Sequence, residues 1–501
     1  MTAIGTPQQS FSPRLLVGGA ALLLVLISVV TAPAPPATDE PWRWATVALA
    51  AVNCSWNVLS AANAFHRTGP VSLVGFLHLW AFVAFSLPAA EMTFRYEQLS
   101  TGYWQIYTDI PLVFQAALLL FVFQAIFFLT LGRGVDGICA RLIEDSRIQS
   151  PQPRVGYIFL ALLIPLILAR LLVLRGLGVS GAATAAITRL DYFAQLDSGV
   201  SPLVWALNTA FPVYAVVLGC LAVKFLIPHP SSLGRRLFVL VLIGSTGGVA
   251  LSGGRAEIVL VAVTVGVFMY AAGYRTARQY RPLVTLGVLV AVLLFAVAQA
   301  RHGEDNVLSR AAGDAYVGND YSSGDVTQVL GLGRFDAMVM ILDRHDRSDA
   351  LMGSSYGGAL VNGLDETFIP QIVAGIDFEP PTVSGDVLGR WVFGDSQNSA
   401  LPSAPGEGYI NFGYAGIVLA AVAIGLLTRG LVHGIAYLSG PQEASIVLVA
   451  WTVARLLSDE SGLLMSFAVR NWPIAILALV LTRNTLKTEP RQERLHHGSE
   501  R

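Results

Sequence analysis

Charged residues are scarce in this chain. Asp, Glu, Lys and Arg make up 13% of its 501 residues, whereas a soluble domain carries about 25%. The three cysteines, Cys54, Cys139 and Cys220, are odd in number, and none lies in the one long polar segment, 301–408. This pattern argues against a disulfide framework and against a cysteine metal site. The formal net charge is -1, so nothing favours a nucleic-acid partner.

Hydrophobic residues instead make up 54% of the chain. They recur in runs of about 17 to 25 residues, each long enough for an α-helix to cross a hydrocarbon core of ~30 Å. We therefore predict an all-α polytopic membrane protein with twelve transmembrane helices. The expected spans are 15–30, 44–61, 71–90, 110–131, 156–174, 203–227, 237–251, 256–272, 282–300, 409–428, 442–457 and 462–482. The pair 237–251 and 256–272 has the shortest runs and a tight turn between them.

The distribution of arginine predicts how these spans are oriented, because cytoplasmic loops carry an excess of Lys and Arg. With a cytoplasmic N-terminus, the inner loops hold Arg67, Arg133, Arg141, Arg147, Arg154, Arg235, Arg236, Arg275, Arg278, Arg281 and Arg429. The predicted domains are then 1–300 with nine spans and a smaller outer loop at 175–202, a large extracytoplasmic loop at 301–408, three more spans within 409–482, and a cytoplasmic tail at 483–501. The expected location is the cytoplasmic membrane.

The large loop is rich in apolar side chains such as Phe335, Ile341 and Trp391, which a disordered segment would lack. Residues 334–344 have apolar positions at helical spacing, and several prolines divide the later part into short pieces. We therefore expect a partly helical loop that lies over the helix bundle. No ATP-binding loop, dinucleotide fingerprint or trusted metal motif occurs, so no cofactor and no metal are expected.

The strongest candidate for chemistry is Glu407, where the large loop returns to the membrane. It lies between Gly406 and Gly408, which permit close approach of a ligand, and Tyr409 and Asn411 add a hydroxyl and an amide suited to sugar binding. Partial burial at the membrane rim would raise the pKa of such a carboxylate toward the range of a general base. The alternative is that Glu407 merely stabilises a helix N-terminus.

A second candidate is Arg255, in the tight outer turn 251–257. Its position on the outer face opposes the positive-inside bias, so it needs an anionic partner, either Glu257 or a lipid diphosphate. The planar guanidinium suits phosphate because it donates two parallel hydrogen bonds.

Further candidates for substrate binding are cations and one tyrosine on the expected outer face. Each arginine can equally be a membrane-interface anchor, and a set of them makes an anion site only if they converge. Tyr356 lies in a glycine-rich turn that can also be a plain loop corner. These candidates are Arg170, Arg301, Arg334, Arg390 and Tyr356.

Taken together, these features resemble the O-antigen polymerase (Wzy-type) superfamily of oligosaccharide repeat-unit polymerases. The resemblance rests on about twelve spans with two sizeable outer loops, on the Ser-Gly-Gly-Arg turn at 252–255, and on Gly-Ser-Ser-Tyr at 353–356 followed by Ile-Pro at 369–370. It rests above all on the Gly-Glu-x-Tyr-x-Asn-Phe-Gly element at 406–413. The family often has a basic residue soon after Ile-Pro, where this chain has Gln371.

The resemblance implies a GT-C-like, metal-independent glycosyltransferase on the outer membrane face. A growing glycan would leave one polyprenyl (undecaprenyl) diphosphate and join a sugar hydroxyl of another lipid-linked unit. Glu407 would act as the base, Arg255 and Arg301 would hold the diphosphate, and Arg390 and Tyr409 would line a glycan groove. The implied partners are the lipid-linked oligosaccharide and membrane lipid, and the protein would work either alone or with a chain-length regulator.

Three other functions fit parts of the pattern. An O-antigen-ligase-like transferase would share the fold and the leaving group but use another acceptor. A polysaccharide or lipid transporter would place ionisable residues in mid-span and show repeated halves, whereas here the polar residues concentrate outside the spans. A membrane scaffold would leave the apolar-rich loop unexplained.

Overall fold

A computed structural model describes residues 41–90, 110–132, 134–147, 152–188, 202–227, 230–250, 255–276, 278–289, 335–344, 387–388, 402–436 and 442–458. Every regular element in this part of the chain is a helix. The elements with assigned bounds are α2 (Pro41–Thr68), η1 (Gly69–Val71), α3 (Leu73–Ala81), the π-helical turn η2 (Phe82–Ser86), α5 (Ile110–Leu131), α6 (Gly134–Arg147), α7 (Pro153–Thr188), α9 (Pro202–Leu226), α10 (Ser232–Ala250), α11 (Arg255–Ala271), α15 (Phe335–Arg344), α19 (Ser403–Ala436) and α20 (Gln442–Ser458). Residues 278–289 are also helical.

Six of these helical segments are long and apolar enough to cross a membrane: Pro41–Thr68, Leu73–Ala90, Pro111–Leu131, Pro153–Gly176, Ser232–Ala250 and Ser403–Ala436. Two shorter apolar helices, Ala210–Leu226 and Glu257–Ala271, accompany them. The chain is therefore an all-α, multi-pass membrane protein, as predicted. The total of twelve spans stays a prediction, because 15–30 and 462–482 lie outside the described residues and 282–300 is described only as far as 289.

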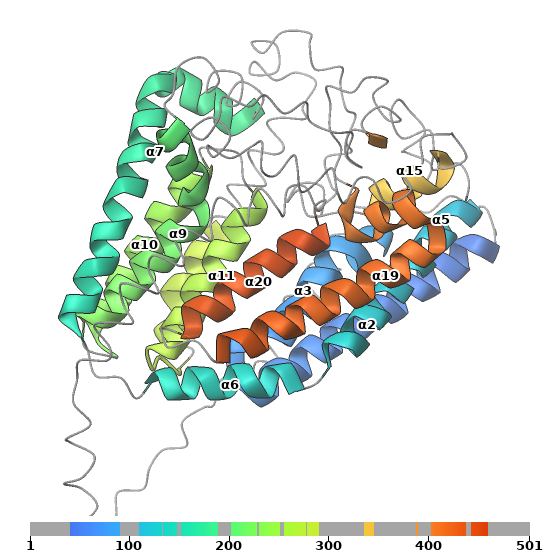
Figure 1. The fold of residues 1–501 in the computed structure, drawn as a ribbon, viewed down its shortest axis with the longest axis horizontal. Helices are drawn as coiled ribbons and strands as arrows, with labels where there is room; N and C mark the ends of the chain where they lie inside the picture. Colours follow the sequence, from blue (N-terminus) through green and yellow to red (C-terminus); the bar gives the residue numbers. More distant parts are fainter. Residues whose placement is uncertain are drawn as a thin grey trace, which may run out of the picture.

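The bundle has two distinct ends, shown in Figure 1. At one end α6 lies across the helix termini and packs on η1, α3, α19 and α20. At the opposite end α15 packs on α5, α19 and η2. We call these the α6 end and the α15 end. Arginines gather toward the α6 end, at the end of α2, on α6, at the starts of α7 and α10, and after α11: Arg67, Arg141, Arg154, Arg235, Arg236 and Arg275. This is the pattern expected of a cytoplasmic end, and the assignment of sides stays a prediction.

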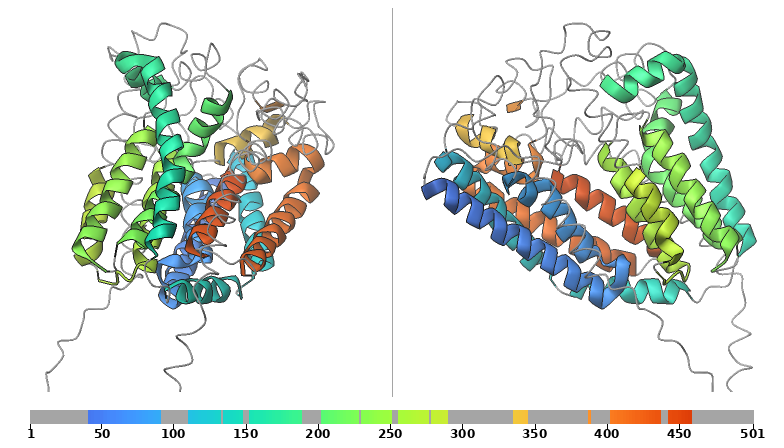
Figure 2. Two further views of the ribbon diagram at one scale, coloured as in Figure 1. Left: turned by 60° about the vertical axis from the view of Figure 1, so that its left-hand side comes forward. Right: turned by 180° about the vertical axis from the view of Figure 1, so that it is seen from behind.

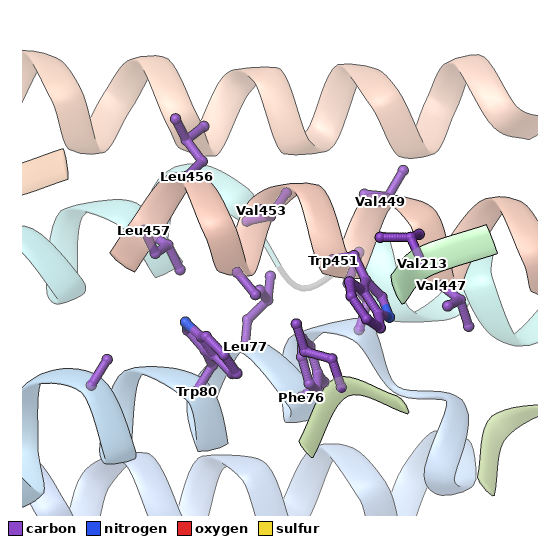
Figure 3. Close-up of a cluster of buried hydrophobic side chains, with 14 of the residues drawn as sticks. Phe76, Leu77, Trp80, Val213, Val447, Val449, Trp451, Val453, Leu456 and Leu457 are labelled. Atoms are coloured by element: carbon purple, nitrogen blue, oxygen red, sulfur yellow. The ribbon is translucent and has the colours of Figure 1, made fainter. Parts of the chain in front are cut away.

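The helices form two groups with α20 between them (Figures 1 and 2). In one group α9 packs on α7, α10 and α11, and in the other α5 packs on α2 and α19. Helix α20 contacts both groups, through α9 and α11 on one side and α3 and α19 on the other. Figure 3 shows the apolar core at this junction, including Trp451 of α20, Phe76 and Trp80 of α3, and Val213 of α9. Because lipid is as apolar as these side chains, helix association here depends on close packing and on polar contacts.

Helix α20 makes such polar contacts along its whole length. Near its start, the buried Glu443 pairs with Lys224 of α9. Further along, the indole of Trp451 donates to the hydroxyl of Thr264 in α11 over 2.9 Å. At its end, Ser458 accepts from the indole of Trp80 in α3 over 2.6 Å. These contacts hold α20 against both helix groups.

A second buried polar cluster lies within α2, α3 and α5. The amide nitrogen of Asn57 lies 3.0 Å from Ser86 Oγ and 2.7 Å from Gln124 Oε1, and its amide oxygen lies 2.8 Å from His78 Nδ1. Ser86 ends the π-helical turn η2, and such turns are typical of places where a helix adapts to a local contact. The cluster thus fixes the register of three helices inside an otherwise apolar core.

Helix α6 is tied to the start of α3 by Asp136. One carboxylate oxygen accepts from the hydroxyl of Ser72 over 2.7 Å, and the other accepts from the backbone nitrogen of Val74 over 3.0 Å. Ser72 also caps α3, since its hydroxyl accepts from the nitrogen of Gly75. Burial raises the pKa of Asp136, and the hydrogen bonds from Ser72 and Val74 oppose this effect. A buried carboxylate thus holds the amphipathic α6 across the bundle end.

One predicted loop boundary is wrong, and two predicted helical stretches are confirmed. Helix α7 continues to Thr188, so the predicted smaller loop at 175–202 is helical in its first part. The helical pattern predicted at 334–344 is confirmed by α15. The pair predicted at 237–251 and 256–272 is confirmed as the separate helices α10 and α11, with limits that differ by a few residues.

The Lys224–Glu443 pair provides a test of how α20 is held. We expect Lys224→Met to lower the free energy of unfolding by about 3–5 kcal/mol, because it leaves the Glu443 carboxylate buried without this counter-charge. The double variant Lys224→Met with Glu443→Leu should recover most of that loss, since it buries no charge at this position. The measurement is thermal unfolding in detergent, with the exposed Arg429→Met as the control. Equal instability of the single and double variants would contradict this account.

Candidate functional site

The site is built around a sharp turn inside α19. Gly413 has φ 61° and ψ -145°, and the two helical segments 403–412 and 414–436 meet there. This backbone conformation is essentially open only to glycine. The predicted single span at 409–428 is therefore wrong at its start, because Tyr409 to Phe412 belong to a separate segment that precedes the turn. We call residues 403–412 the hairpin segment.

Two further glycines hold the hairpin segment against the helix that follows it. A Cβ atom added to Gly408 would lie 2.5 Å from the carbonyl oxygen of Gly416, and one added to Gly416 would overlap the carbonyl oxygen of Gly408. Real Cβ atoms do not approach that closely. The two backbones are thus in direct contact, and any side chain at either position would separate them. Gly408, Gly413 and Gly416 together make the reversal possible.

One side of the hairpin segment is covered by α15. A Cβ atom added to Gly406 would lie 2.6 Å from Cδ1 of Ile341, a residue of α15. Helix α5 supports the membrane-spanning segment from another side, with Thr130 close to Gly425. The hairpin segment therefore lies between a helix of the large polar loop and the helices of the bundle.

Glu407 is held in the centre of this arrangement and is 2% exposed. It lies beyond the first turn of the hairpin segment, so it does not stabilise a helix start, which was the alternative to a chemical role. The amide nitrogen of the equally buried Asn411 donates to the backbone carbonyl of Glu407 over 2.8 Å. The sequence-predicted residues Glu407, Tyr409 and Asn411 thus occur together on one short, fixed segment.

Ser403 adds a feature that sequence reasoning missed. It begins the hairpin segment with φ 64°, and it is the one non-glycine residue with positive φ in the described part of the chain. Its side chain is fully buried, and its hydroxyl has no hydrogen-bond partner among the described residues. Ser403 and Glu407 are four positions apart, which places them on the same helix face. Strained backbone and an unsatisfied buried hydroxyl are costly, and both features cluster at functional sites.

An aromatic contact extends from the hairpin segment to the bundle surface. Tyr409 is buried, and its ring meets that of Tyr414 edge-on at 5.2 Å between centroids. The hydroxyl of Tyr414 accepts from the side-chain nitrogen of Gln115 in α5. This contact fixes both sides of the Gly413 turn relative to α5.

Arg170 lies at the same end of the bundle but inside the other helix group. It is 4% exposed, it donates to the side-chain oxygen of Asn208 in α9 over 2.9 Å, and it donates to the carbonyl of Gly248 in α10. Its guanidinium also lies 5.7 Å from the centre of the Phe211 ring. The sequence predicted an outer-face cation, and the structure places it between three helices.

The structure identifies a partner for Glu257 that the sequence did not reveal. Glu257 pairs with Arg455 near the end of α20, whereas the sequence offered Glu257 as a partner for Arg255. The side chain of Arg255 lies outside the described residues, as do Arg301, Arg334, Arg390 and Tyr356. Their predicted roles are neither confirmed nor contradicted.

The remaining reactive side chains do not form a metal site within the described residues, where no group of three or more His, Cys, Asp or Glu side chains has the geometry to hold an ion. Cys139 is buried in α6, and burial raises the pKa of its thiol to about 12. The thiol therefore stays protonated and unreactive. His433 is exposed on α19, with Nδ1 2.8 Å from the carbonyl oxygen of Arg429.

Comparison with protein-family models, with curated protein sequences and with solved structures gives no match to this chain.

The glycine contacts give a direct test of the hairpin. We expect Gly416→Ala to lower the free energy of unfolding by about 1–3 kcal/mol or more, because the added methyl group overlaps the Gly408 backbone. Gly434→Ala on the same helix has nothing within 4 Å of the new Cβ and should be neutral or slightly stabilising. Thermal unfolding in detergent compares the two. If both variants unfold at the same temperature, the backbone contact is absent.

Proposed function

We propose that this protein is a membrane glycosyltransferase that polymerises polyprenyl-diphosphate-linked oligosaccharide repeat units on the outer face of the cytoplasmic membrane. The observation that carries the proposal is the position of Glu407. It is buried on a glycine-hinged helical hairpin, at the end of the bundle covered by α15 of the large polar loop. The family resemblance described above supplies the reaction class.

The proposed reaction is a direct displacement at the anomeric carbon of the donor glycan. The acceptor hydroxyl oxygen forms a bond to that carbon, while the bond from the carbon to the diphosphate oxygen breaks. The electron pair of the broken bond leaves with the diphosphate, and the hydroxyl proton passes to the carboxylate of Glu407. No oxidant, reductant or metal ion is required, and water must be excluded so that it does not replace the acceptor.

Burial of Glu407 supports the role of general base. A buried carboxylate is shielded from bulk water, so solvent would not compete with a bound acceptor hydroxyl for it. The hydrogen bond from Asn411 to the Glu407 carbonyl and the glycine contacts fix the backbone, so the carboxylate needs little reorganisation. Ser403, on the same face, offers a hydroxyl for the acceptor sugar.

Arginine side chains complete the proposed mechanism. Arg255 and Arg301 would hold the diphosphate and stabilise its developing charge, and Arg170, Arg334, Arg390, Tyr356, Tyr409 and Asn411 would line the binding region. In support, Arg255 begins α11 beside the Glu257–Arg455 pair. Arg170 lies near the end of α10, since it donates to the carbonyl of Gly248. Helix α10 ends at Ala250, five residues before α11 begins at Arg255. Both arginines therefore belong to the helix group that contains α7, α9, α10 and α11, which α20 separates from the other group.

Glu407 provides the test of this function. We expect Glu407→Gln to lower polymer formation at least about 100-fold, the lower range for loss of a general base. Lipid-linked single units should persist. Glu407→Asp should retain part of the activity because it keeps a carboxylate. The readout is the glycan length distribution in cells that lack the native protein, at matched expression and thermal stability.

The control is Glu443→Gln, which alters a buried acid near the α6 end and should leave glycan length unchanged whenever the variant folds. Normal polymer length in Glu407→Gln would remove Glu407 from the mechanism. Finished polymer that accumulates on carrier lipid in the absence of the protein would instead indicate a ligase, and lipid-linked units retained on the cytoplasmic face would indicate a transporter.

A further inference from the structure

Exposed aromatic side chains are confined to helix ends in the described part of the chain. Trp42 and Trp44 lie at the start of α2, Tyr157 lies at the start of α7, and Phe412 and Tyr414 flank the Gly413 turn. The exposed hydrophobic residues between these ends are all aliphatic. Trp and Tyr are enriched at membrane–water interfaces because one part of the ring system is apolar and another is polar. The exposed surface thus has the composition of a lipid-facing band with an aromatic edge.

Two of these residues, Trp42 and Tyr414, are both linked to α5 at the α15 end, and Trp44 and Phe412 lie within two positions of them along the chain. The ring of Trp42 lies 5.3 Å from that of Phe114 in α5. The next residue of α5, Gln115, donates to the hydroxyl of Tyr414. Helix α5 therefore joins the start of α2 to the Gly413 turn. We call Trp42, Trp44, Phe412 and Tyr414 the aromatic rim.

The surface that continues from the rim toward the α6 end is aliphatic on each of the helices concerned. The exposed residues are Val52 and Leu59 on α2, Leu118 and Leu129 on α5, and Val418, Leu419, Leu426 and Leu427 on α19. All three helices contain segments long and apolar enough to cross a membrane. This continuity identifies the occupant of the surface as lipid, with acyl chains against the aliphatic band and headgroups at the rim.

We propose that the aromatic rim binds the headgroup region of the leaflet at the α15 end and holds the Gly413 turn at that depth. Glu407 precedes Phe412 by five residues on the hairpin segment, which is about 8 Å along a helix axis. The Glu407 carboxylate then lies close to headgroup level. At that depth the carboxylate can reach the sugar–phosphate bond of the lipid-linked substrate already proposed. Only this last step rests on the proposed function.

Spin labels at defined positions test the depth in lipid nanodiscs. Cysteine is introduced singly at Trp44 and Phe412 on the rim, at Leu426 inside the aliphatic band, and at Arg141 on the exposed face of α6, in a Cys54→Ser background. Relaxation by oxygen and by a water-soluble nickel complex reports the depth of each label. Cys139 and Cys220 are buried, and the background protein measures any labelling of them.

We expect the two rim labels to lie within one interfacial layer, about 5–8 Å thick. The Leu426 label follows Tyr414 by twelve residues, or about 18 Å along the helix, and should show the oxygen-dominated relaxation of the membrane centre. The proposal is overturned if either rim label is as accessible to nickel as the Arg141 label, or is as deep as the Leu426 label. Labels at Trp42→Cys and Tyr414→Cys repeat the measurement at two other rim positions. The depth of the rim can then be determined even if one of the variants does not fold.

This experiment is independent of catalysis. Labels at the expected depth together with normal polymer in Glu407→Gln would keep the lipid surface and remove the proposed function. Rim labels exposed to water, together with lost polymer in Glu407→Gln, would keep the proposed function and remove the lipid surface.

Discussion

The backbone contact between Gly408 and Gly416 is the constraint on which the rest of the candidate site depends. Two peptide backbones can approach this closely only where neither carries a side chain. The contact accompanies the reversal of the chain at Gly413, and glycine at all three positions makes this reversal possible. The reversal places the hairpin segment against α15, where it does not extend the membrane-spanning helix. Glu407 is buried as a consequence of that geometry, because its segment has the bundle on one side and α15 on the other.

The same reasoning explains how the bundle is held together around the hairpin. Apolar helices gain little from meeting one another in lipid, so small residues and internal polar contacts decide which helices associate. Helix α20 supplies the contacts between the two helix groups, with Glu443 near its start and Arg455 near its end. The Asn57 cluster performs a similar task inside one group. These buried and partly buried polar groups have charged or hydrogen-bonding partners, which offset the cost of removing them from water.

The proposed chemistry and the proposed lipid contact meet at the Gly413 turn. On one side of the turn, the buried residues Ser403, Glu407 and Asn411 provide polar groups away from bulk water. At the turn itself, Phe412 and Tyr414 are exposed and aromatic. A substrate with a lipid tail and a sugar head has the same division between apolar and polar parts. In the proposed mechanism, the turn would therefore place the lipid-facing surface beside the segment that binds the sugar.

The sequence by itself determined the helical membrane class, the position of the long polar segment, the helical pattern at 334–344 and the glycine-flanked Glu407. These features are local, because an apolar run or a periodic pattern is complete within some twenty residues. Tertiary structure alone decided that Glu257 pairs with Arg455, that Arg170 is enclosed by Asn208 and Gly248, and that the hairpin turns back at Gly413. Each of these outcomes depends on which distant segments become neighbours in the fold. The local sequence around a charged residue or a glycine does not identify the residue that it contacts.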